Sequence, residues 1–314
     1  MHVVYLEPLP PIVEEIVRGC VPAGCSLRVR RADESPLAIV GDAEYFIVAG
    51  TKVTAELIAA APRLKLIQHQ GVGYDNIDVA AAKRAGVAVA LAPEGSIVPV
   101  AEHTILLILS LYRHLAEAQH ALREGRWLRW ELRPISYDLQ GKVLGIIGMG
   151  RIGREVAQRA RAFGCHILYT DIVPAPPALE ARFEARRVPL ETLLREADIV
   201  TLHVPLQDDT RHMIGARELG LMKPTALLIN AARGGIVDEA ALYKALTSGQ
   251  IAGAGLDVFA QEPPGKDLPF PHLTNVVATP HIAAGTRDAF LTKMQAVFAN
   301  IQRVEAGEPP LNQV

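Results

Sequence analysis

The sequence is poor in cysteine and has no excess of charge of either sign. Its three cysteines, Cys20, Cys25 and Cys165, lack CxxC spacing, which predicts reduced thiols in a cytoplasmic protein rather than a disulfide framework or a metal site. The formal net charge of −2 offers no basic surface to a nucleic-acid partner. Nucleic-acid binding, zinc binding and a disulfide-rich fold are therefore not expected.

Long apolar runs are missing as well. Residues 1–15 have no basic start before an apolar stretch, so no signal peptide is predicted. The most apolar segment, residues 105–109, lies between Glu102-His103 and Arg113. It is too short to span a bilayer and predicts a core helix. No membrane partner is expected.

What the chain does have is a regular alternation of predicted strands and helices, which is typical of parallel α/β sheets. In residues 1–98 the expected strands are 3–6, 27–30, 45–48, 66–68 and 87–91, with helices at 12–17, 54–61 and 79–85. From residue 141 onward we expect a six-stranded doubly wound sheet with strands 143–147, 166–169, 199–202, 226–229, 253–256 and 276–278. The 314 residues have room for about two such domains.

Three segments link or extend the two predicted domains. Residues 99–124 form the longest helical pattern, and Pro99 fits the first turn of one bridging helix. Residues 125–140 contain both tryptophans and predict an irregular arm. A last helix at about 286–305 is expected to pack back on the first domain. The predicted domains are 1–98, completed by 287–314, and 99–286.

A dinucleotide-binding pattern opens the second domain. After the apolar run 143–147, Gly148, Gly150 and Gly153 follow with GxGxxG spacing, and a helical pattern comes next. These glycines allow a tight turn, close approach of a pyrophosphate and close packing of helix on strand. The helix N-terminus offers free N–H groups to the phosphates.

The second strand of this unit ends in Asp171, 18 residues after Gly153. A carboxylate there accepts hydrogen bonds from a ribose diol and repels a 2′-phosphate, which favours NAD over NADP. GxGxxG alone is often only a glycine-rich turn. Strand, glycines, helix, strand and acid in this order favour a cofactor site.

Candidate catalytic residues follow the last three predicted strands. Ligands of open α/β sheets bind at the carboxyl ends of strands, and Arg233, Glu262 and His281 all lie there. Arg233 can hold a carboxylate by a two-point fork. His281 can donate a proton to an oxygen while a hydride reaches the carbon, and Glu262 can bind the far ring nitrogen and favour imidazolium. Each residue alone is more often a surface or structural group, but together they suit hydride transfer at a 2-oxo acid.

The chain resembles the NAD-dependent D-isomer-specific 2-hydroxyacid dehydrogenase family. The matching stretches cover most of the sequence and are GVGYDNID (71–78), AEHTILLIL (101–109), GKVLGIIGMGRIG (141–153), ADIVTLHVPL (197–206), LINAARGGIVDE (228–239), GLDVFAQEPP (255–264) and TPHIAAGT (279–286). The resemblance implies a flavodoxin-like substrate domain, built from both chain ends, beside a doubly wound Rossmann NAD domain through which homodimers commonly form.

The resemblance also implies roles for individual residues. Arg233, Glu262 and His281 are implied as the catalytic set. The backbone N–H groups of Val72 and Gly73 are implied to receive the substrate carboxylate. The implied cofactor contacts are Thr104, Gly148, Gly150, Arg151, Ile152, Gly153, Asp171, Pro205, Thr210, Ala231 and Asp257. The residues leave a second role open for Asp257, which is to cap the loop that follows it.

Departures from the family pattern narrow the expected substrate. Relatives that act on 3-phosphoglycerate carry Arg-Ser where this chain has Ala49-Gly50, and phosphite-oxidising relatives carry lysine at Gln70. Glu262 is glutamine in formate-oxidising relatives. The segment WLRWELRP (127–134) resembles the arm of glyoxylate and hydroxypyruvate reductases, in which a tryptophan, here Trp130, reaches the partner subunit's pocket. A plain hydrophobic dimer contact is the alternative.

The expected function is reduction of a small 2-oxo acid with NADH. Two alternatives stay open. One is a 3-phosphoglycerate dehydrogenase. The other is an NADH-sensing corepressor scaffold of the same fold, whose long disordered tails would be expected to extend well beyond the last helix; here the chain ends at Val314.

Overall fold

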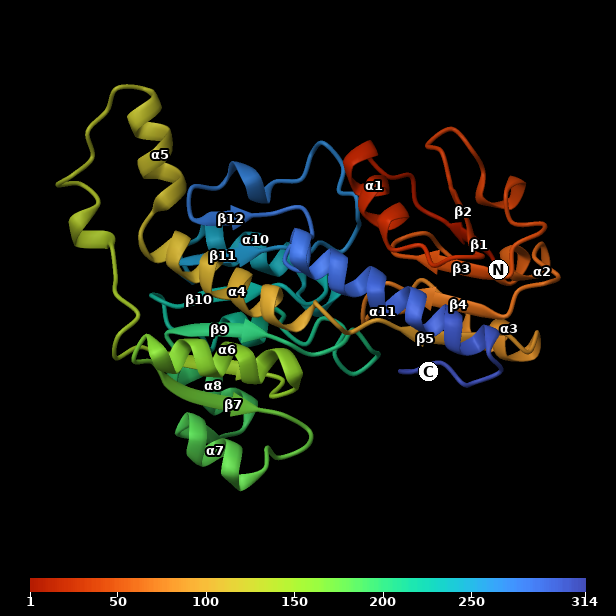
Figure 1. The fold of residues 1–314 in the computed structure, drawn as a ribbon. Helices are drawn as coiled ribbons and strands as arrows, with labels where there is room; N and C mark the ends of the chain where they lie inside the picture. Colours follow the sequence, from red (N-terminus) through yellow and green to blue (C-terminus); the bar gives the residue numbers. More distant parts are fainter. The chain divides into compact units, whose positions relative to one another are not determined.

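The computed structural model describes residues 1–314 as two compact units. Unit 1 consists of residues 1–96 and 286–314, and unit 2 of residues 97–285. Both chain ends therefore belong to unit 1 (Figure 1). The sequence-based boundaries were 98/99 and 286/287.

Unit 1 contains a five-stranded parallel sheet in the order β2-β1-β3-β4-β5. This order confirms the predicted flavodoxin-like topology. Val, Ile and Phe runs on the central strands are buried on both faces, as a sheet covered by helices on both sides requires. Its elements are β1 (His2–Tyr5), α1 (Pro11–Gly19), β2 (Ser26–Val29), β3 (Tyr45–Val48), α2 (Ala55–Ala59), β4 (Leu66–His69), α3 (Val79–Arg84) and β5 (Ala88–Leu91).

The C-terminal helix α11 (Arg287–Glu305) packs on this sheet. Its buried face packs with α1 on one face of the strands, while α2 and α3 cover the other face. Thr286 caps α11 by accepting the Ala289 N–H at 3.1 Å. Residues far apart in sequence thus complete one domain.

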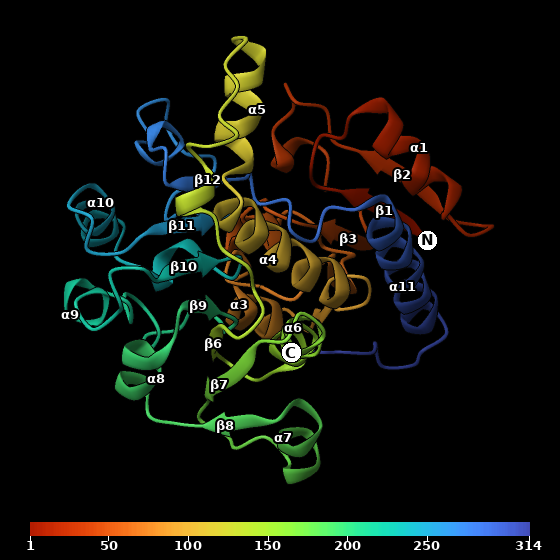
Figure 2. The same cartoon turned by 90° about the vertical axis from the view of Figure 1, so that its left-hand side faces the viewer.

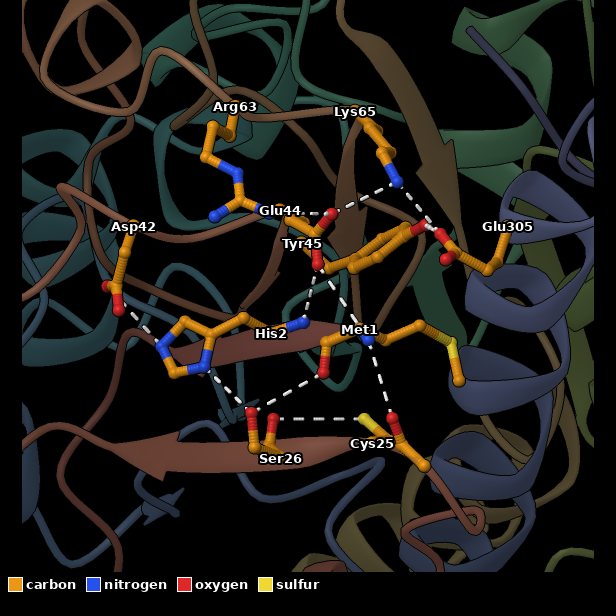
Figure 3. Close-up of polar contacts among 11 residues, drawn as sticks. Met1, His2, Cys25, Ser26, Asp42, Glu44, Tyr45, Arg63, Lys65 and Glu305 are labelled. Carbon is orange, nitrogen blue, oxygen red and sulfur yellow. Dashed lines mark hydrogen bonds and ion pairs between the residues drawn. The ribbon is translucent and has the colours of Figure 1, made fainter.

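A polar network binds the end of α11 to the amino edge of the unit 1 sheet (Figure 3). The Tyr45 hydroxyl and the Lys65 ammonium both donate to Glu305 Oε2, at 2.5 and 2.8 Å. Lys65 also lies 3.1 Å from Glu44 Oε1, and Glu44 accepts the His2 N–H at 2.9 Å. The hydrogen bonds that Lys65 donates to Glu305 and Glu44 raise the pKa of Lys65. The network leaves the carboxyl edge of the sheet free.

Unit 2 contains a seven-stranded parallel sheet in the order β12-β11-β10-β9-β6-β7-β8. The strand order reverses between β6 and β9, which marks the ligand crevice of a doubly wound sheet. The doubly wound fold is confirmed. The strands are β6 (Val143–Ile147), β7 (His166–Thr170), β8 (Ala185–Arg187), β9 (Ile199–Leu202), β10 (Leu227–Asn230), β11 (Gly253–Leu256) and β12 (Val276–Ala278).

The prediction of six strands was wrong because it missed β8. This strand is three residues long and ends in two exposed arginines. It lies at the sheet edge and pairs only with β7. Short, charged edge strands lack the apolar run by which buried strands are recognised.

The prediction of one helix over residues 99–124 was also wrong. Helix α4 (Ile97–Tyr112) ends before His114, which adopts a left-handed backbone (φ 49°), and α5 (Leu115–Arg123) begins anew. A left-handed residue interrupts the helical hydrogen bonds, and neither Gly nor Pro marks the break. Figure 2 shows α5 standing out from the rest of unit 2.

The remaining helices cover the two faces of the unit 2 sheet. Helix α4 packs with α6 (Arg151–Ala162) on one face. Helices α8 (Leu190–Glu196), α9 (Ala216–Leu219) and α10 (Glu239–Thr247) cover the other, and α7 (Pro177–Phe183) lies near the β8 edge. No helix in the structure combines the length and apolar character needed to cross a membrane.

Candidate active site

Three neighbouring strands of unit 2 bring the predicted catalytic residues to one edge. Arg233 follows β10, Glu262 follows β11 and His281 follows β12. Because these strands are parallel neighbours, their carboxyl ends adjoin. All three residues belong to unit 2, so their arrangement depends on one domain alone.

His281 and Glu262 form a hydrogen-bonded pair. His281 Nδ1 lies 2.5 Å from Glu262 Oε2, and Glu262 Oε1 accepts the Phe259 N–H at 2.9 Å. Burial works to raise the pKa of Glu262, but the hydrogen bonds from His281 and Phe259 and the charge of Arg233 hold that pKa below its usual range. His281 Nε2 makes no hydrogen bond within the protein, and 46% of the side chain is exposed. The pair thus presents one free ring nitrogen, backed by a carboxylate.

Arg233 lies on a backbone turn that the sequence packs closely against the Glu262 loop. The Asn230 side chain donates to the Arg233 carbonyl at 2.9 Å and accepts the Ala232 N–H at 3.1 Å. A Cβ at Gly234 would lie 1.9 Å from the Phe259 carbonyl carbon. Only glycine permits this approach. Close backbone packing therefore places the Arg233 segment beside the Glu262 loop, and the Arg233 guanidinium donates to the Ala232 carbonyl at 2.8 Å.

Asp257 organises the loop that carries His281. Its fully buried carboxylate accepts hydrogen bonds from the Thr279 hydroxyl at 2.6 Å and from the N–H groups of Ile282 and Ala283 at 2.9 and 2.8 Å. The Asp257 carbonyl accepts the His281 N–H at 2.7 Å. His281 itself has φ 52°, an uncommon conformation that these bonds stabilise. The loop-capping role left open by the sequence is thus observed.

Two further histidines at this edge were not singled out from the sequence. His103 Nε2, on α4, lies 2.9 Å from the Thr279 hydroxyl and 3.6 Å from Asp257. His203 follows β9, and burial lowers its pKa to about 3. His203 therefore stays neutral near pH 7 and is unsuited to donate a proton. The only sequence signal for His103 was its position directly before Thr104, which is a predicted cofactor contact.

The glycine loop between β6 and α6 has the shape that a dinucleotide requires. Gly148 has φ +97°, and a Cβ there would lie 2.6 Å from the His203 carbonyl. A Cβ at Gly153 would lie 2.1 Å from the Gly148 carbonyl oxygen, whereas Gly150 faces open space at the start of α6. The turn and the helix contact thus depend on Gly148 and Gly153, and the space before Gly150 fits a pyrophosphate.

Asp171 lies directly after β7 beside this loop. Its Oδ2 accepts the Met149 N–H at 2.7 Å and its Oδ1 accepts the Val173 N–H at 3.1 Å. Each carboxylate oxygen keeps a further lone pair for a ribose hydroxyl. The residues present therefore fit the adenosine side of NAD.

The other predicted cofactor contacts lie around the same edge. Ile152 and Ala231 share a small apolar cluster with Val100 and Ala283. The Thr210 hydroxyl donates to the Pro205 carbonyl at 2.7 Å and closes the loop after β9. Contacts of all these residues with the cofactor stay predictions.

Of the predicted cofactor-contact residues, one is fully buried and one is exposed at a helix end. Thr104 is fully buried, and its hydroxyl donates to the Val100 carbonyl at 2.8 Å, so only its acceptor lone pairs remain. Arg151 is exposed at the first turn of α6. Their roles also stay predictions.

The other predicted substrate groups belong to unit 1 and to the arm of unit 2. Val72 and Gly73 follow β4 in unit 1, and their N–H groups make no hydrogen bond within the protein. Trp130 is 65% exposed in the arm of unit 2, with the guanidinium groups of Arg129 and Arg133 over its ring at 5.3 and 4.5 Å.

Comparison with known proteins agrees with this geometry. Residues 105–283 match the family model described as D-isomer specific 2-hydroxyacid dehydrogenase, NAD binding domain. The chain is 44% identical to a glyoxylate reductase of Korarchaeum cryptofilum over 264 residues, which are 83% of this chain and 79% of that protein. It is also 44% identical to a D-3-phosphoglycerate dehydrogenase of Methanocaldococcus jannaschii over 277 residues, 88% of this chain but only 52% of that protein.

Solved structures show the same fold across both units. A D-lactate dehydrogenase from Aquifex aeolicus, in complex with NAD and lactic acid, matches with a TM-score of 0.85 and 32% identity. The match covers 98% of this chain and 96% of that one.

Proposed function

Because this chain belongs to the D-isomer-specific 2-hydroxyacid dehydrogenase family, we propose that it reduces a small, unphosphorylated 2-oxo acid to the D-2-hydroxy acid. The observation that carries this proposal is the His281–Glu262 pair beside Arg233 at the carboxyl edge of the unit 2 sheet. Glyoxylate and hydroxypyruvate are the proposed substrates, as in the relatives named for those reactions.

Each catalytic side chain has a separate chemical task. Bound NADH supplies the hydride that reaches the carbonyl carbon. Arg233 binds the substrate carboxylate and polarises the neighbouring carbonyl. His281 delivers a proton from Nε2 to the carbonyl oxygen, and the Glu262 carboxylate stabilises the imidazolium before transfer. In the reverse direction, neutral His281 accepts that proton from the hydroxyl group.

Unit 1 supports the choice of an unphosphorylated acid. The Glu7 carboxylate lies against the Ala49-Gly50 segment, where Oε1 accepts the N–H groups of Ala49 and Thr51 at 2.9 and 2.8 Å. A carboxylate at this position repels a phosphate dianion, and the segment carries no arginine to offset it. We propose that the free N–H groups of Val72 and Gly73 bind the substrate carboxylate.

The neighbouring polar groups also fit a substrate with a hydroxyl group on the third carbon. His69 is not available, because its ring nitrogens lie 2.8 Å from the Ala49 carbonyl and 2.9 Å from the Gly71 N–H. The Tyr5 hydroxyl donates to Gln70 Oε1, which leaves the Gln70 amide N–H groups as donors. We propose Gln70 as the group that accommodates this hydroxyl.

A panel of 2-oxo acids tests the proposal through the loss of NADH absorbance. We expect the highest kcat/KM for glyoxylate or hydroxypyruvate, and lower values for phenylpyruvate and 3-phosphohydroxypyruvate. The phosphorylated acid as the best substrate would instead make the chain a 3-phosphoglycerate dehydrogenase. Tight NADH binding without turnover of any acid would support the scaffold function.

We also propose that the protein is a cytoplasmic homodimer. Apolar side chains of α5 and the arm are exposed: Leu115 by 54%, Leu122 by 58%, Trp127 by 72% and Trp130 by 65%. A cluster of this kind on one projecting segment fits a partner subunit. All three cysteines are free, which supports a reducing compartment.

A further inference from the structure

The overlooked edge strand β8 places an arginine beside the residue that selects the cofactor. Arg187 ends β8 and pairs in register with Tyr169 on β7. Its Nη2 donates to the backbone carbonyl of Asp171 at 2.7 Å. Figure 2 shows β8 at the outer edge of the unit 2 sheet, next to β7. One exposed guanidinium therefore sits against the same residue whose carboxylate fits the ribose.

The guanidinium keeps most of its hydrogen-bonding capacity. Arg187 forms no ion pair, and four of its five N–H donors are unused within the protein. Together with Thr170, Val188 and Pro189 it lines a surface depression of about 330 Å³. The preceding Arg186 is different, since its guanidinium pairs with Glu196 at 2.5 Å.

Arg187 and Asp171 have opposite effects on the two forms of the cofactor. The 2′-hydroxyl of NAD needs an acceptor such as a carboxylate, whereas the 2′-phosphate of NADP needs a cation such as guanidinium. The Asp171 carboxylate supplies the acceptor that the 2′-hydroxyl of NAD needs, and it repels the 2′-phosphate of NADP. Arg187 lies on the adjoining strand, with free donors and no carboxylate that neutralises it.

We propose that Arg187 is a 2′-phosphate ligand, so that the same site also binds NADP while Asp171 keeps NAD preferred. The preference for NAD then reflects the opposing charges of Asp171 and Arg187, and NADP is bound more weakly without being excluded. This inference goes beyond the proposed reaction, because it does not depend on which acid is reduced.

Binding of adenosine fragments tests the proposal without turnover. Calorimetric titration of the cofactor-free protein with 2′,5′-ADP and with 5′-AMP isolates the contribution of the 2′-phosphate. We expect Arg187→Ala to weaken 2′,5′-ADP binding about tenfold, as a charge-assisted hydrogen bond at an exposed site allows, and to change 5′-AMP binding less than about twofold. Arg187→Lys should retain part of the affinity, because it keeps the charge but not the fork.

Arg186→Ala is the matched control, since it removes the same charge from the same strand. It should leave both fragments unaffected. Asp171→Asn should strengthen 2′,5′-ADP binding about tenfold, and this gain should disappear in the double variant with Arg187→Ala. The ratio of kcat/KM for NADPH to that for NADH should follow the same order.

Three results would overturn the proposal. Equal weakening of both fragments by Arg187→Ala would make Arg187 a packing group for adenine or ribose. No effect on either fragment, or a gain in Asp171→Asn that persists without Arg187, would remove it from phosphate recognition. Fragment binding tests the role of Arg187 even if the protein reduces no 2-oxo acid, so failure of this proposal can be distinguished from failure of the proposed function.

Discussion

At the scale of single residues, the site depends on a histidine that has one ring nitrogen bound and the other free. Glu262 binds His281 Nδ1 at 2.5 Å, and Nε2, which has no hydrogen bond within the protein, is the atom that we propose meets the substrate. Asp257 holds the loop around this histidine through four hydrogen bonds, three from backbone N–H groups and one from the Thr279 hydroxyl. Proton transfer and loop geometry are thus assigned to different carboxylates.

Replacement of His281 by alanine should remove the chemical step and retain cofactor binding. The general acid is lost, which costs roughly 100- to 10,000-fold in rate, while the glycine loop and Asp171 are untouched. Single-turnover hydride transfer and NADH affinity measure the two effects separately. His272→Ala, which alters an exposed histidine of the same domain, should behave as wild type. Activity within threefold of wild type for His281→Ala would remove His281 from this role.

Glu262→Gln should change the pH dependence of the reaction. The pKa of Glu262 lies below its usual range, so in the wild type the carboxylate stays charged above about pH 4.3 and lies 2.5 Å from His281 Nδ1. Without this charge, reduction should lose activity about tenfold near pH 7, and its pH profile should shift. Oxidation of the hydroxy acid, which needs neutral His281, should be less affected.

The matched control for this variant is Glu239→Gln. Glu239 accepts the Ala260 N–H in the same loop at 2.6 Å but does not contact His281. It should leave the pH profiles unshifted. Identical profiles for Glu262→Gln and wild type would show that the Glu262 charge has no part in proton transfer.

At the scale of elements, the β6–α6 connection depends on three glycines for different reasons. Gly153 must lack a side chain because of the Gly148 carbonyl, whereas Gly150 has no protein atom within 4 Å of an added Cβ. The first is required by the fold of the loop itself. The second is required only by the ligand.

Gly153→Ala should therefore impair stability, whereas Gly150→Ala should impair cofactor binding. Gly153→Ala should lower the melting temperature, because a contact of 2.1 Å forces the helix away from the strand. Gly150→Ala should melt like the wild type but bind NADH at least about tenfold more weakly, since its methyl group occupies space needed by the pyrophosphate. Calorimetry measures both quantities. Normal NADH affinity in Gly150→Ala would contradict the assigned cofactor position.

The network at the end of α11 predicts a pH-dependent stability of unit 1. Hydrogen bonds from Lys65 and Tyr45 lower the pKa of Glu305, so its stabilisation is present above the unfolded pKa, about 4.3, and is lost as pH falls through the folded value. Glu305→Gln should cost about 0.5–1 kcal/mol at pH 7, given the exposure of the pair, and almost nothing at pH 3. Urea unfolding at both pH values measures this.

Glu308→Gln serves as the control for that measurement. Glu308 pairs with Arg303 at 3.0 Å on the exposed side and does not touch the sheet. It should show a smaller loss at pH 7. An undiminished loss for Glu305→Gln at pH 3 would mean that packing, not charge, explains the effect.

At the scale of the whole molecule, the break between α4 and α5 directs an apolar segment outward. Leu122→Asp adds a charge to this segment and should convert the proposed dimer into a monomer, because burying an unpaired carboxylate is costly. Light scattering should give twice the 33.9 kDa subunit mass for wild type and one subunit mass for the variant. Ile12→Asp, which alters an isoleucine that is 72% exposed in unit 1, should remain dimeric. A wild-type monomer at micromolar concentration would contradict the proposal.

The sequence by itself determined the features that depend on neighbouring residues. Predominantly apolar runs of four or five residues predicted β3, β6 and β9, because strands buried on both faces have few polar positions. Glycine spacing and the acid after β7 predicted the cofactor and its loop, since the spacing of glycines and acid along the chain is itself the pattern of a dinucleotide site. The order of strands and helices predicted a parallel sheet covered by helices on both faces in unit 1 and a doubly wound sheet in unit 2, whereas the flavodoxin-like topology of unit 1 was implied by the family resemblance.

The tertiary structure alone decided the features that depend on distant residues. The β8 strand exists because β7 offers it an edge, not because its two arginines favour a strand. Nothing in the local sequence shows that Asp257 binds the backbone of residues 282 and 283, or that His103 reaches Thr279. Such contacts join segments up to 176 residues apart, and hydrogen bonds of this kind leave no periodic pattern in the chain, because packing of the whole domain, rather than local propensity, brings the partners together.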